Sequence, residues 1–359
     1  MRRRLPGPVC GFTRSEYTCG VGRVHRESAC GTSPRGWGAC GQNRGGELGR
    51  VIHAIVNPRS GAGWTRWRWP RIAQRLDGAG VVVRSYVTSA PDEATRLTRD
   101  LLCAGVPEIL SVGGDGTANE VANGFLRDGR PIAPDAVLSL MPTGTGHDFA
   151  RSLGIASTTD ALAALLDGHV RAVDVGWIDY RGPDGRAQRC FVNAADVGIG
   201  AVAAARINRS SKLLGGFLTY LVGAARTIVT ARPRLARVVI DGVPVLDGPV
   251  QMILIANGGF HAGGMRMAPG ASLTDGQFEV LVLQGVPRTA LLGSILPRAY
   301  RGTHIRHPAI IYRRGRAVEV SADEPLLFEM DGESPGTTDL AAEVLPGVLR
   351  VRVPQWPPP

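Results

Sequence analysis

The feature that most constrains this chain is the run at residues 111–120, in which three glycines surround a single acid, Asp115. The apolar residues 109–112 lead into it and predict a short buried strand, and Thr117 is placed to cap a helix that follows. The predicted unit is therefore a strand, a tight glycine turn and a helix. Glycine lets the backbone approach a ligand closely, and the first N–H groups of a helix attract phosphate, so the unit indicates a phosphate-binding turn.

Asp115 is the unusual residue of this turn, because a bare carboxylate would repel phosphate. It therefore needs a metal ion, a hydroxyl group or an amide to face. The alternative is that Asp115 is an ordinary turn residue, a role that aspartate often takes.

Two more glycine loops follow predicted strands in the first half of the chain. The strand at residues 51–56 leads into a loop at residues 57–63, and the strand at residues 136–141 leads into a loop at residues 142–149. A further strand is predicted at 81–87, with helices at 64–76, 91–104 and 159–166. The aromatic residues of the first of these helices are expected in the core or at a domain contact. This alternation predicts a mostly parallel sheet covered on both faces, whose ligands bind at the carboxyl ends of the strands. The three loops should therefore converge on one site.

From about Val173 the pattern changes to short strands separated by Asp-Gly and Asn-Gly turns. The predicted strands are residues 190–194, 237–241, 250–257, 278–283, 309–312, 318–320, 326–330 and 348–353. Helices are predicted at residues 211–230 and 287–300. This half of the chain reads as an antiparallel β-sandwich. Asn193 and Asp196 either line a cleft or cap a turn.

The net charge of +10 is concentrated near the start of the chain, because nine Arg and three Glu give residues 1–50 a charge of +6. The remainder carries only +4, so no nucleic-acid partner is expected. Residues 1–50 also lack periodicity and are predicted to form a disordered basic tail. Lys212 is the only lysine, and a GxxxxGK[ST] phosphate loop does not occur.

The hydrophobic pattern predicts no transmembrane helix. The longest uncharged apolar stretch, between Lys212 and Arg226, has 13 residues, whereas a membrane-spanning helix needs about 20. No apolar segment follows Arg2, Arg3 and Arg4, so a signal peptide is not expected. We expect a soluble cytoplasmic protein that associates with a membrane only peripherally.

Four motifs, in this order, resemble those of the diacylglycerol kinase catalytic-domain family, which includes bacterial lipid kinases and sphingosine kinases. They are Asn57-Pro58-Arg59-Ser60-Gly61, Gly113-Gly114-Asp115-Gly116-Thr117-Ala118-Asn119-Glu120, Gly144-Thr145-Gly146-His147-Asp148-Phe149-Ala150-Arg151 and Asp331-Gly332-Glu333. The resemblance covers residues 51–353. It departs at His147, where the family usually has Asn, and this puts the nucleotide geometry of the third loop in question.

The resemblance implies an α/β nucleotide domain like that of NAD kinases over residues 51–172, then a β-sandwich over residues 173–344 that receives a lipid substrate. Residues 345–353 would return to the first domain. Glu333 would accept the proton of the lipid hydroxyl, with Asp331 as the alternative base and Asp115 as a further catalytic residue. Mg²⁺ would bind Ser272, Asp275 and Gln277, although an ordinary turn is an equal reading of Asp275. ATP would contact Asn57, Pro58, Arg59, Ser60, Gly61, Thr88, Gly114, Asp115, Gly116, Thr117, Ala118, Asn119, Glu120 and Thr145.

The expected activity is transfer of the γ-phosphoryl group of ATP to a lipid hydroxyl, with diacylglycerol as the first choice. The alternatives are a kinase of NAD or of sphingoid bases, or a regulator that binds nucleotide or lipid without turnover. Residues 287–300 and the arginines around them, Arg288, Arg298, Arg301 and Arg306, form either a membrane-surface face or a solvated basic helix. The oligomeric state is open, and a homodimer is one option.

Overall fold

The computed structural model describes residues 50–144, 146–202 and 232–355, which belong to one compact unit of the chain. The predicted tail up to residue 49, Thr145, the predicted helix at residues 211–230 and the last four residues lie outside the described part. Arg50, which the sequence assigned to the tail, is the first residue of strand β1.

The first half of the described chain contains a parallel sheet in the strand order β6-β3-β1-β2. These strands are β1 (Arg50–Val56), β2 (Val81–Val87), β3 (Glu108–Gly113) and β6 (Val137–Pro142). All six residues of β3 are buried, as expected for an apolar strand with both faces covered. Two short strands, β4 (Leu126–Arg127) and β5 (Arg130–Pro131), form a separate hairpin.

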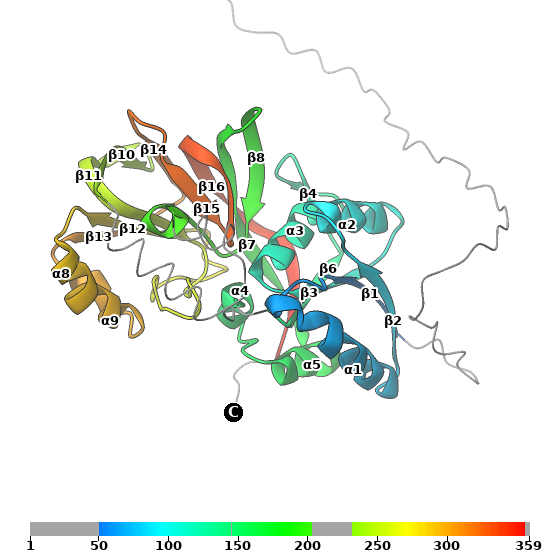
Figure 1. Ribbon diagram of the computed structural model, residues 1–359. Coiled ribbons are helices and arrows are strands. Elements are labelled where there is room, and N and C mark those ends of the chain that lie inside the picture. Colours follow the sequence, from blue (N-terminus) through cyan, green and yellow to red (C-terminus); the bar gives the residue numbers. More distant parts are fainter. Residues whose placement is uncertain (1–49, 145, 203–231, 356–359) are drawn as a thin grey trace, which may run out of the picture. The chain divides into compact units, whose positions relative to one another are not determined.

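Helices cover both faces of this sheet (Figure 1). On one face lie α2 (Glu93–Cys103) and α3 (Asp115–Phe125), and on the other lie α1 (Thr65–Gly78) and α5 (Thr158–Asp167). The short helices η1 (Gly61–Gly63) and α4 (Asp148–Ser152) belong to the first and third glycine loops. The carboxyl ends of β1, β3 and β6 therefore each open into a glycine loop.

The second half is rich in antiparallel strands, which confirms the predicted β-sandwich. Its strands are β7 (His169–Gly182), β8 (Gly185–Phe191), β9 (Ala194–Gly198), β10 (Arg234–Ile240), β11 (Val243–Ala256), β12 (Phe278–Gln284), β13 (Ile310–Gly315), β14 (Ala317–Ser321), β15 (Leu327–Met330) and β16 (Glu333–Val353). They enclose a core that includes Phe191, Phe278 and Phe328, each fully buried. The hairpins β10–β11 and β15–β16 turn at Asp241-Gly242 and Asp331-Gly332, where all four residues have positive φ.

Strand β16 links the two halves of the fold. It is 21 residues long and pairs in antiparallel fashion with β15, β14 and β7. Near its end, Arg350 and Val351 pair in parallel with Val137 and Leu138 of β6. The last strand of the chain thus lies at the side of the first sheet.

Several predicted elements need correction. The predicted strand at residues 190–194 is instead the end of β8 and the start of β9, separated by Val192 and Asn193, whose backbone amides serve a buried carboxylate. Strand β7 was not predicted. The aromatic residues of the predicted first helix are not all in a core. Trp69 of α1 is buried, whereas Trp67 and also Trp64, which precedes α1, are more than half exposed.

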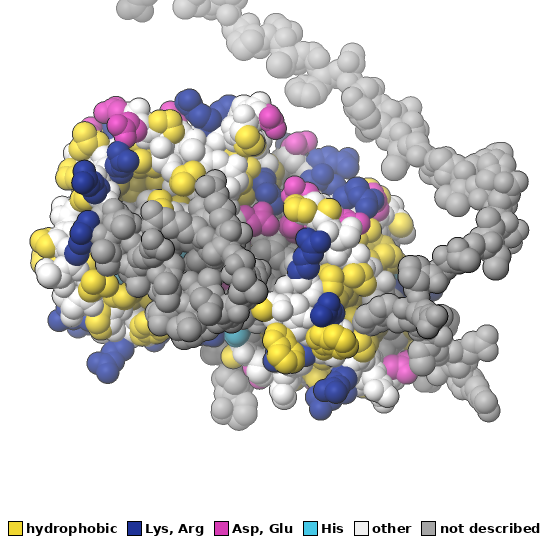
Figure 2. Space-filling model, viewed as in Figure 1, with side chains coloured by type: hydrophobic (Ala, Val, Ile, Leu, Met, Phe, Trp, Pro, Cys, Tyr) yellow, Lys and Arg dark blue, Asp and Glu magenta, His cyan; other side chains and the backbone are white. Residues whose placement is uncertain are grey.

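The predicted helix at residues 287–300 is present as α8 (Arg288–Ala290), the π-helical turn η3 (Leu291–Ile295) and α9 (Leu296–Ala299), followed by the short helix η4 (His304–Arg306). Leu291 and Ile295 are buried in a separate hydrophobic cluster with residues of β11 and β12. Leu292 remains exposed, and Figure 2 shows basic side chains around hydrophobic atoms on this part of the surface. The apolar surface that this helix offers outward is therefore smaller than the sequence indicated.

Candidate functional site

The three glycine loops meet at the carboxyl edge of the parallel sheet. The side-chain amide of Asn57 in the first loop donates to Oγ1 of Thr117 in the second, at 3.1 Å. The backbone amides of Thr143 and Gly144 in the third loop donate to the carbonyl oxygen of Gly113. A Cβ atom at Gly144 would lie 2.7 Å from Cα of Gly114, so only glycine permits this approach. The structure thus brings together the loops that the sequence predicted to converge.

Helix α3 begins at Asp115, earlier than predicted, since the sequence placed the N-cap at Thr117. Its N-cap is Gly114, which has extended backbone angles, and Thr117 lies in the first turn. The hydroxyl of Thr117 is therefore not a cap. It accepts the hydrogen bond from Asn57 and joins two loops.

Asp115 caps the helix of the third loop. Its two carboxylate oxygens accept hydrogen bonds from the backbone amides of Asp148 and Phe149, each at 3.1 Å. Amides are thus the groups that this acid faces. Burial, followed by the nearby Asp148 carboxylate, raises the pKa of Asp115 to about 7. These contacts make Asp115 a positioning residue, which fixes the second loop against the third.

Asp331 is buried and also binds backbone amides. It accepts hydrogen bonds from the amides of Val192, Asn193 and Ala194 at 2.7–3.0 Å, and from the side chain of Asn119 at 2.8 Å. Burial raises the pKa of Asp331, and these hydrogen bonds oppose that rise. Four donors leave this carboxylate little capacity to act on a substrate, so its geometry favours a structural role.

Glu333 lies two residues after Asp331, at the start of β16, with about a third of its side chain exposed. Its Oε1 atom is 3.7 Å from the point where a Cβ atom of Gly116 would lie, so the carboxylate adjoins the first turn of α3. Its Oε2 atom accepts a hydrogen bond from Arg189 at 3.2 Å. Burial raises the pKa of Glu333, whereas Arg189 opposes the rise. Glu333 is thus an accessible carboxylate beside the predicted phosphate site.

Other predicted nucleotide contacts point elsewhere. The side chain of Asn119 is fully buried and donates to Asp331 and to the carbonyl oxygen of Cys190. Glu120 accepts a hydrogen bond from the backbone amide of Ala94 in α2. The hydroxyl of Thr88 donates to the carbonyl oxygen of Val56. These three residues connect neighbouring elements, whereas Arg59 in the first loop is exposed.

His147, the departure from the family pattern, occupies the N-cap position of α4. Its Nε2 atom lies 3.3 Å from a guanidinium nitrogen of Arg151. Burial, with a further contribution from Arg151, lowers the pKa of His147, so the imidazole is neutral near pH 7. It lines a small pocket beside Asp115 together with Gly113, Gly114 and Ala118.

The predicted magnesium ligands lie on the loop before β12. Both carboxylate oxygens of Asp275 have partners, which are the guanidinium of Arg314 and the backbone amide of Gln277. The hydroxyl of Ser272 lies 3.4 Å from that of Thr274. Oxygen ligands of this kind suit Mg²⁺, but an ion would have to compete with Arg314 for a carboxylate oxygen of Asp275. The metal role of these residues stays a prediction.

Two residues near the site were not predicted. Arg189, at the end of β8, forms ion pairs with Glu333 and with Asp92 at 3.5 Å. Asp148 accepts a hydrogen bond from the backbone amide of Gly263 at 2.7 Å and so connects α4 to the loop after β11. Arg189 has no local sequence signal, whereas Asp148 belongs to the third glycine motif.

Comparison with known proteins identifies the family. Residues 51–178 match the diacylglycerol kinase catalytic domain, and residues 193–353 match the YegS C-terminal NAD kinase beta sandwich-like domain. The chain is 31% identical to a diacylglycerol kinase of Staphylococcus carnosus over 292 residues, which cover 79% of this chain and 88% of that protein. It is 28% identical to a diacylglycerol kinase of Bacillus subtilis over 284 residues, which cover 79% and 89%.

The chain belongs to the diacylglycerol kinase family. The crystal structure of a diacylglycerol kinase from Bacillus anthracis has the same fold, with a TM-score of 0.62 over 86% of this chain and 98% of that one, at 19% identity. Membership makes the protein a kinase, a phosphotransferase that binds a nucleotide, and implies the use of ATP. Among the described residues of this kinase, none of the helices has both the length and the hydrophobicity required to cross a bilayer.

Proposed function

We propose that this kinase transfers the γ-phosphoryl group of ATP to the free hydroxyl of diacylglycerol. The observation that carries the proposal is the position of Glu333 beside Gly116, where an accessible carboxylate adjoins three converging glycine loops. The names of the relatives from S. carnosus and B. subtilis support diacylglycerol as the acceptor.

The glycine loops bind the phosphates of the nucleotide in this proposal. The backbone amides at the start of α3 and the exposed side chain of Arg59 supply positive charge where phosphate oxygens would lie. Asp115 and Thr117 hold the second loop against the third and the first, so the donors are fixed before the nucleotide binds. Phosphoryl transfer depends on such positioning and on neutralisation of charge, to which Mg²⁺ contributes when it is bound with ATP.

Glu333 takes the proton of the lipid hydroxyl in this proposal. An alcohol is a weak nucleophile at neutral pH, and a positioned base typically accelerates its reaction by about 10²–10⁴-fold. Arg189 fixes the orientation of Glu333 through one carboxylate oxygen, which leaves Oε1 directed toward the first turn of α3. Asp331 is the weaker candidate for the base, because four donors already occupy it.

We also propose that the kinase works at a membrane surface, where a lipid such as diacylglycerol resides. The face that would meet the membrane consists of the exposed Leu292 and the exposed arginines Arg288, Arg298, Arg301 and Arg306. A small apolar contact with several basic neighbours suits an anionic lipid surface.

Labelled ATP and a panel of acceptors test the proposal. Purified kinase is incubated with diacylglycerol, a sphingoid base, NAD or no acceptor, and the labelled products are separated. Label transfer to diacylglycerol, lost in the Glu333→Gln variant, is the expected result. Transfer to NAD or to the sphingoid base would establish one of those alternatives. Nucleotide binding without any transfer would indicate a regulator.

A further inference from the structure

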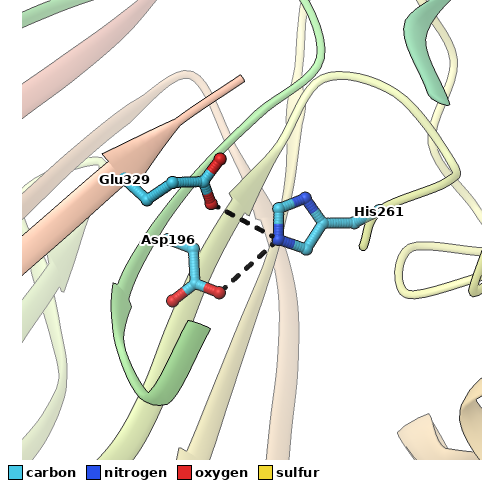
Figure 3. Close-up of side chains that lie close together, drawn as sticks. All are labelled: Asp196, His261 and Glu329. Carbon is cyan, nitrogen blue, oxygen red and sulfur yellow. Dashed lines mark ion pairs between the residues drawn. The ribbon is translucent and has the colours of Figure 1, made fainter. Parts of the chain in front are cut away.

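Three side chains that the proposed phosphoryl transfer does not use meet within the β-sandwich (Figure 3). Asp196 on β9 and Glu329 on β15 lie opposite each other in adjacent antiparallel strands. His261 comes from the loop after β11. Its Nε2 atom lies 3.6 Å from a carboxylate oxygen of Asp196 and 3.6 Å from one of Glu329. One potential ligand atom from each residue lies within 4.8 Å of the other two.

The cluster is buried and incompletely paired. Asp196 is fully buried, and neither of its carboxylate oxygens has a hydrogen-bond partner within the described part of the chain. Glu329 is 4% exposed, and its other oxygen accepts a hydrogen bond from the backbone amide of Gly332. The two oxygens of Asp196 are therefore buried polar atoms whose hydrogen-bonding capacity no described residue satisfies, and such an unsatisfied group is costly.

An ion pair with a protonated His261 is the simplest alternative, but the geometry is poor for it. The imidazole has one N–H group at Nε2, and a distance of 3.6 Å to each carboxylate exceeds that of a hydrogen bond. A metal ion binds imidazole nitrogen and carboxylate oxygen at about 2.0–2.2 Å, so two of its ligand atoms can lie up to about 4.3 Å apart. The two distances from Nε2 to the carboxylate oxygens, 3.6 Å each, lie within that range.

We propose that Asp196, His261 and Glu329 bind one divalent transition-metal ion. A set of two carboxylates and one imidazole, without thiolate, favours an ion such as Mn²⁺, which accepts both oxygen and nitrogen ligands. Mg²⁺ prefers oxygen ligands alone and is expected to bind more weakly. Solvent or a further ligand would complete the coordination shell.

The bound ion would hold the loop after β11 against the sandwich. That loop also reaches the third glycine loop, because the amide of Gly263 donates to Asp148 at the start of α4. The ion would therefore stabilise a contact between the sandwich and the nucleotide-binding half, at a position separate from the ATP phosphates.

The test counts bound Mn²⁺ on the full-length, tag-free protein after treatment with a chelator and removal of the chelator. Electron paramagnetic resonance measures free Mn²⁺ during a titration without nucleotide. The wild type is expected to bind one equivalent more than His261→Gln. Affinity should fall in Asp196→Asn by more than the roughly 10–100-fold that loss of an outer-shell partner costs. His169→Gln, the same substitution at an exposed histidine, is the matched control.

The variant Asp275→Asn tests whether this site is distinct from the predicted magnesium loop. It should still bind the equivalent of Mn²⁺ that is lost in His261→Gln. Thermal unfolding of the wild type provides a measurement that needs no variant, and Mn²⁺ should raise the Tm of the chelator-treated protein more than Mg²⁺ does. Equal Mn²⁺ binding by the wild type and by Asp196→Asn would overturn the proposal. So would an unchanged Tm at saturating Mn²⁺, which would leave His261 as a protonated partner of the two acids.

Discussion

Two features of its surroundings, the contact with Arg189 and burial, affect the ability of Glu333 to take a proton. Arg189 favours the charged carboxylate, whereas burial raises its pKa above the ordinary glutamate value. A base with a raised pKa holds a transferred proton more firmly, and it becomes inactive when the pH falls below that pKa.

The substitution Glu333→Gln is expected to lower kcat by about 10²–10⁴-fold, because glutamine keeps the size of the side chain and loses the proton affinity. ATP affinity should change little. The wild type should lose kcat as the pH falls through the raised pKa of Glu333, and the variant should lack this dependence. Steady-state kinetics between about pH 4.5 and about pH 8 provide the measurement, because this range starts near the ordinary carboxyl pKa and extends well above it.

Asp331→Asn is the comparison for this experiment. If it abolishes turnover in a folded protein while Glu333→Gln retains most of its kcat, the base is Asp331. If both variants remain active, the base lies elsewhere and Asp115 becomes the next candidate.

Asp115→Asn should weaken the cap of α4 and reduce turnover without unfolding the protein. Asparagine offers one acceptor oxygen in place of two, so one of the amides of Asp148 and Phe149 loses its partner. The expected loss of unfolding free energy is about 1–3 kcal/mol, measured by urea denaturation. Asp323→Asn, at an exposed aspartate, is the control. A folded variant with normal kcat/KM would show that the contacts of Asp115 are not needed for turnover.

The residues of the site differ in how far sequence could predict them. The loops could be predicted because each carries its signal in a few adjacent residues that follow an apolar strand. The partners of Asp331 could not, because its backbone donors lie about 140 residues away, between β8 and β9 and at the first residue of β9. The pairing of Arg189 with Glu333 likewise joins residues 144 positions apart.

Helices α2 and α3 pack closely at a glycine. A Cβ atom at Gly124 would lie 2.3 Å from Cβ of Thr98 and 2.8 Å from the carbonyl oxygen of Thr95. Gly124→Ala should therefore destabilise the protein by about 1–3 kcal/mol, in spite of the better helix propensity of alanine. Gly293→Ala is the matched control, since nothing lies within 4 Å of its added Cβ, and it should be neutral or stabilising. Thermal unfolding of both variants checks this packing.

The element formed by α8, η3 and α9 carries the proposed membrane contact. Activity should be higher on vesicles that contain anionic lipid, and it should fall with salt, because surface charges are screened within about 8 Å at physiological ionic strength. Arg301→Glu should weaken vesicle binding by at least about fivefold, because each basic residue near an anionic membrane surface contributes roughly 1 kcal/mol of binding free energy. Arg75→Glu on α1 is the control, and equal effects of the two substitutions would argue against this face.

Elements with a complete local pattern were predicted well, and those defined by distant partners were not. The strands of the parallel sheet and the helices between them have strong periodicity and clear turns. Strand β7 was missed although one of its partners, β8, follows it directly; its other partner, β16, lies more than 150 positions later and has no local signal. The domain boundaries at residues 172 and 344 stay predictions.

At the scale of the whole molecule, the described fold begins at Arg50. A variant that lacks residues 1–47 should keep the Tm and kcat of the full chain, measured side by side. Arg50→Ala in that variant should lower the unfolding free energy by about 1.5–3 kcal/mol, because the guanidinium of Arg50 donates to the buried carboxylate of Glu108. Loss of folding or activity on deletion alone would show that the deleted residues are structural.

The pairing of β16 with β6 sets an order for biosynthesis. The ribosome releases β6 long before β16, so the free edge of β6 gains its partner only when Arg350 and Val351 emerge. Until then the nascent sheet exposes an open strand edge, which can pair with other chains. A premature stop codon shortly before residue 350 would leave that edge open permanently. The codons for Arg350 and Val351 therefore protect a sheet made much earlier in synthesis from aggregation.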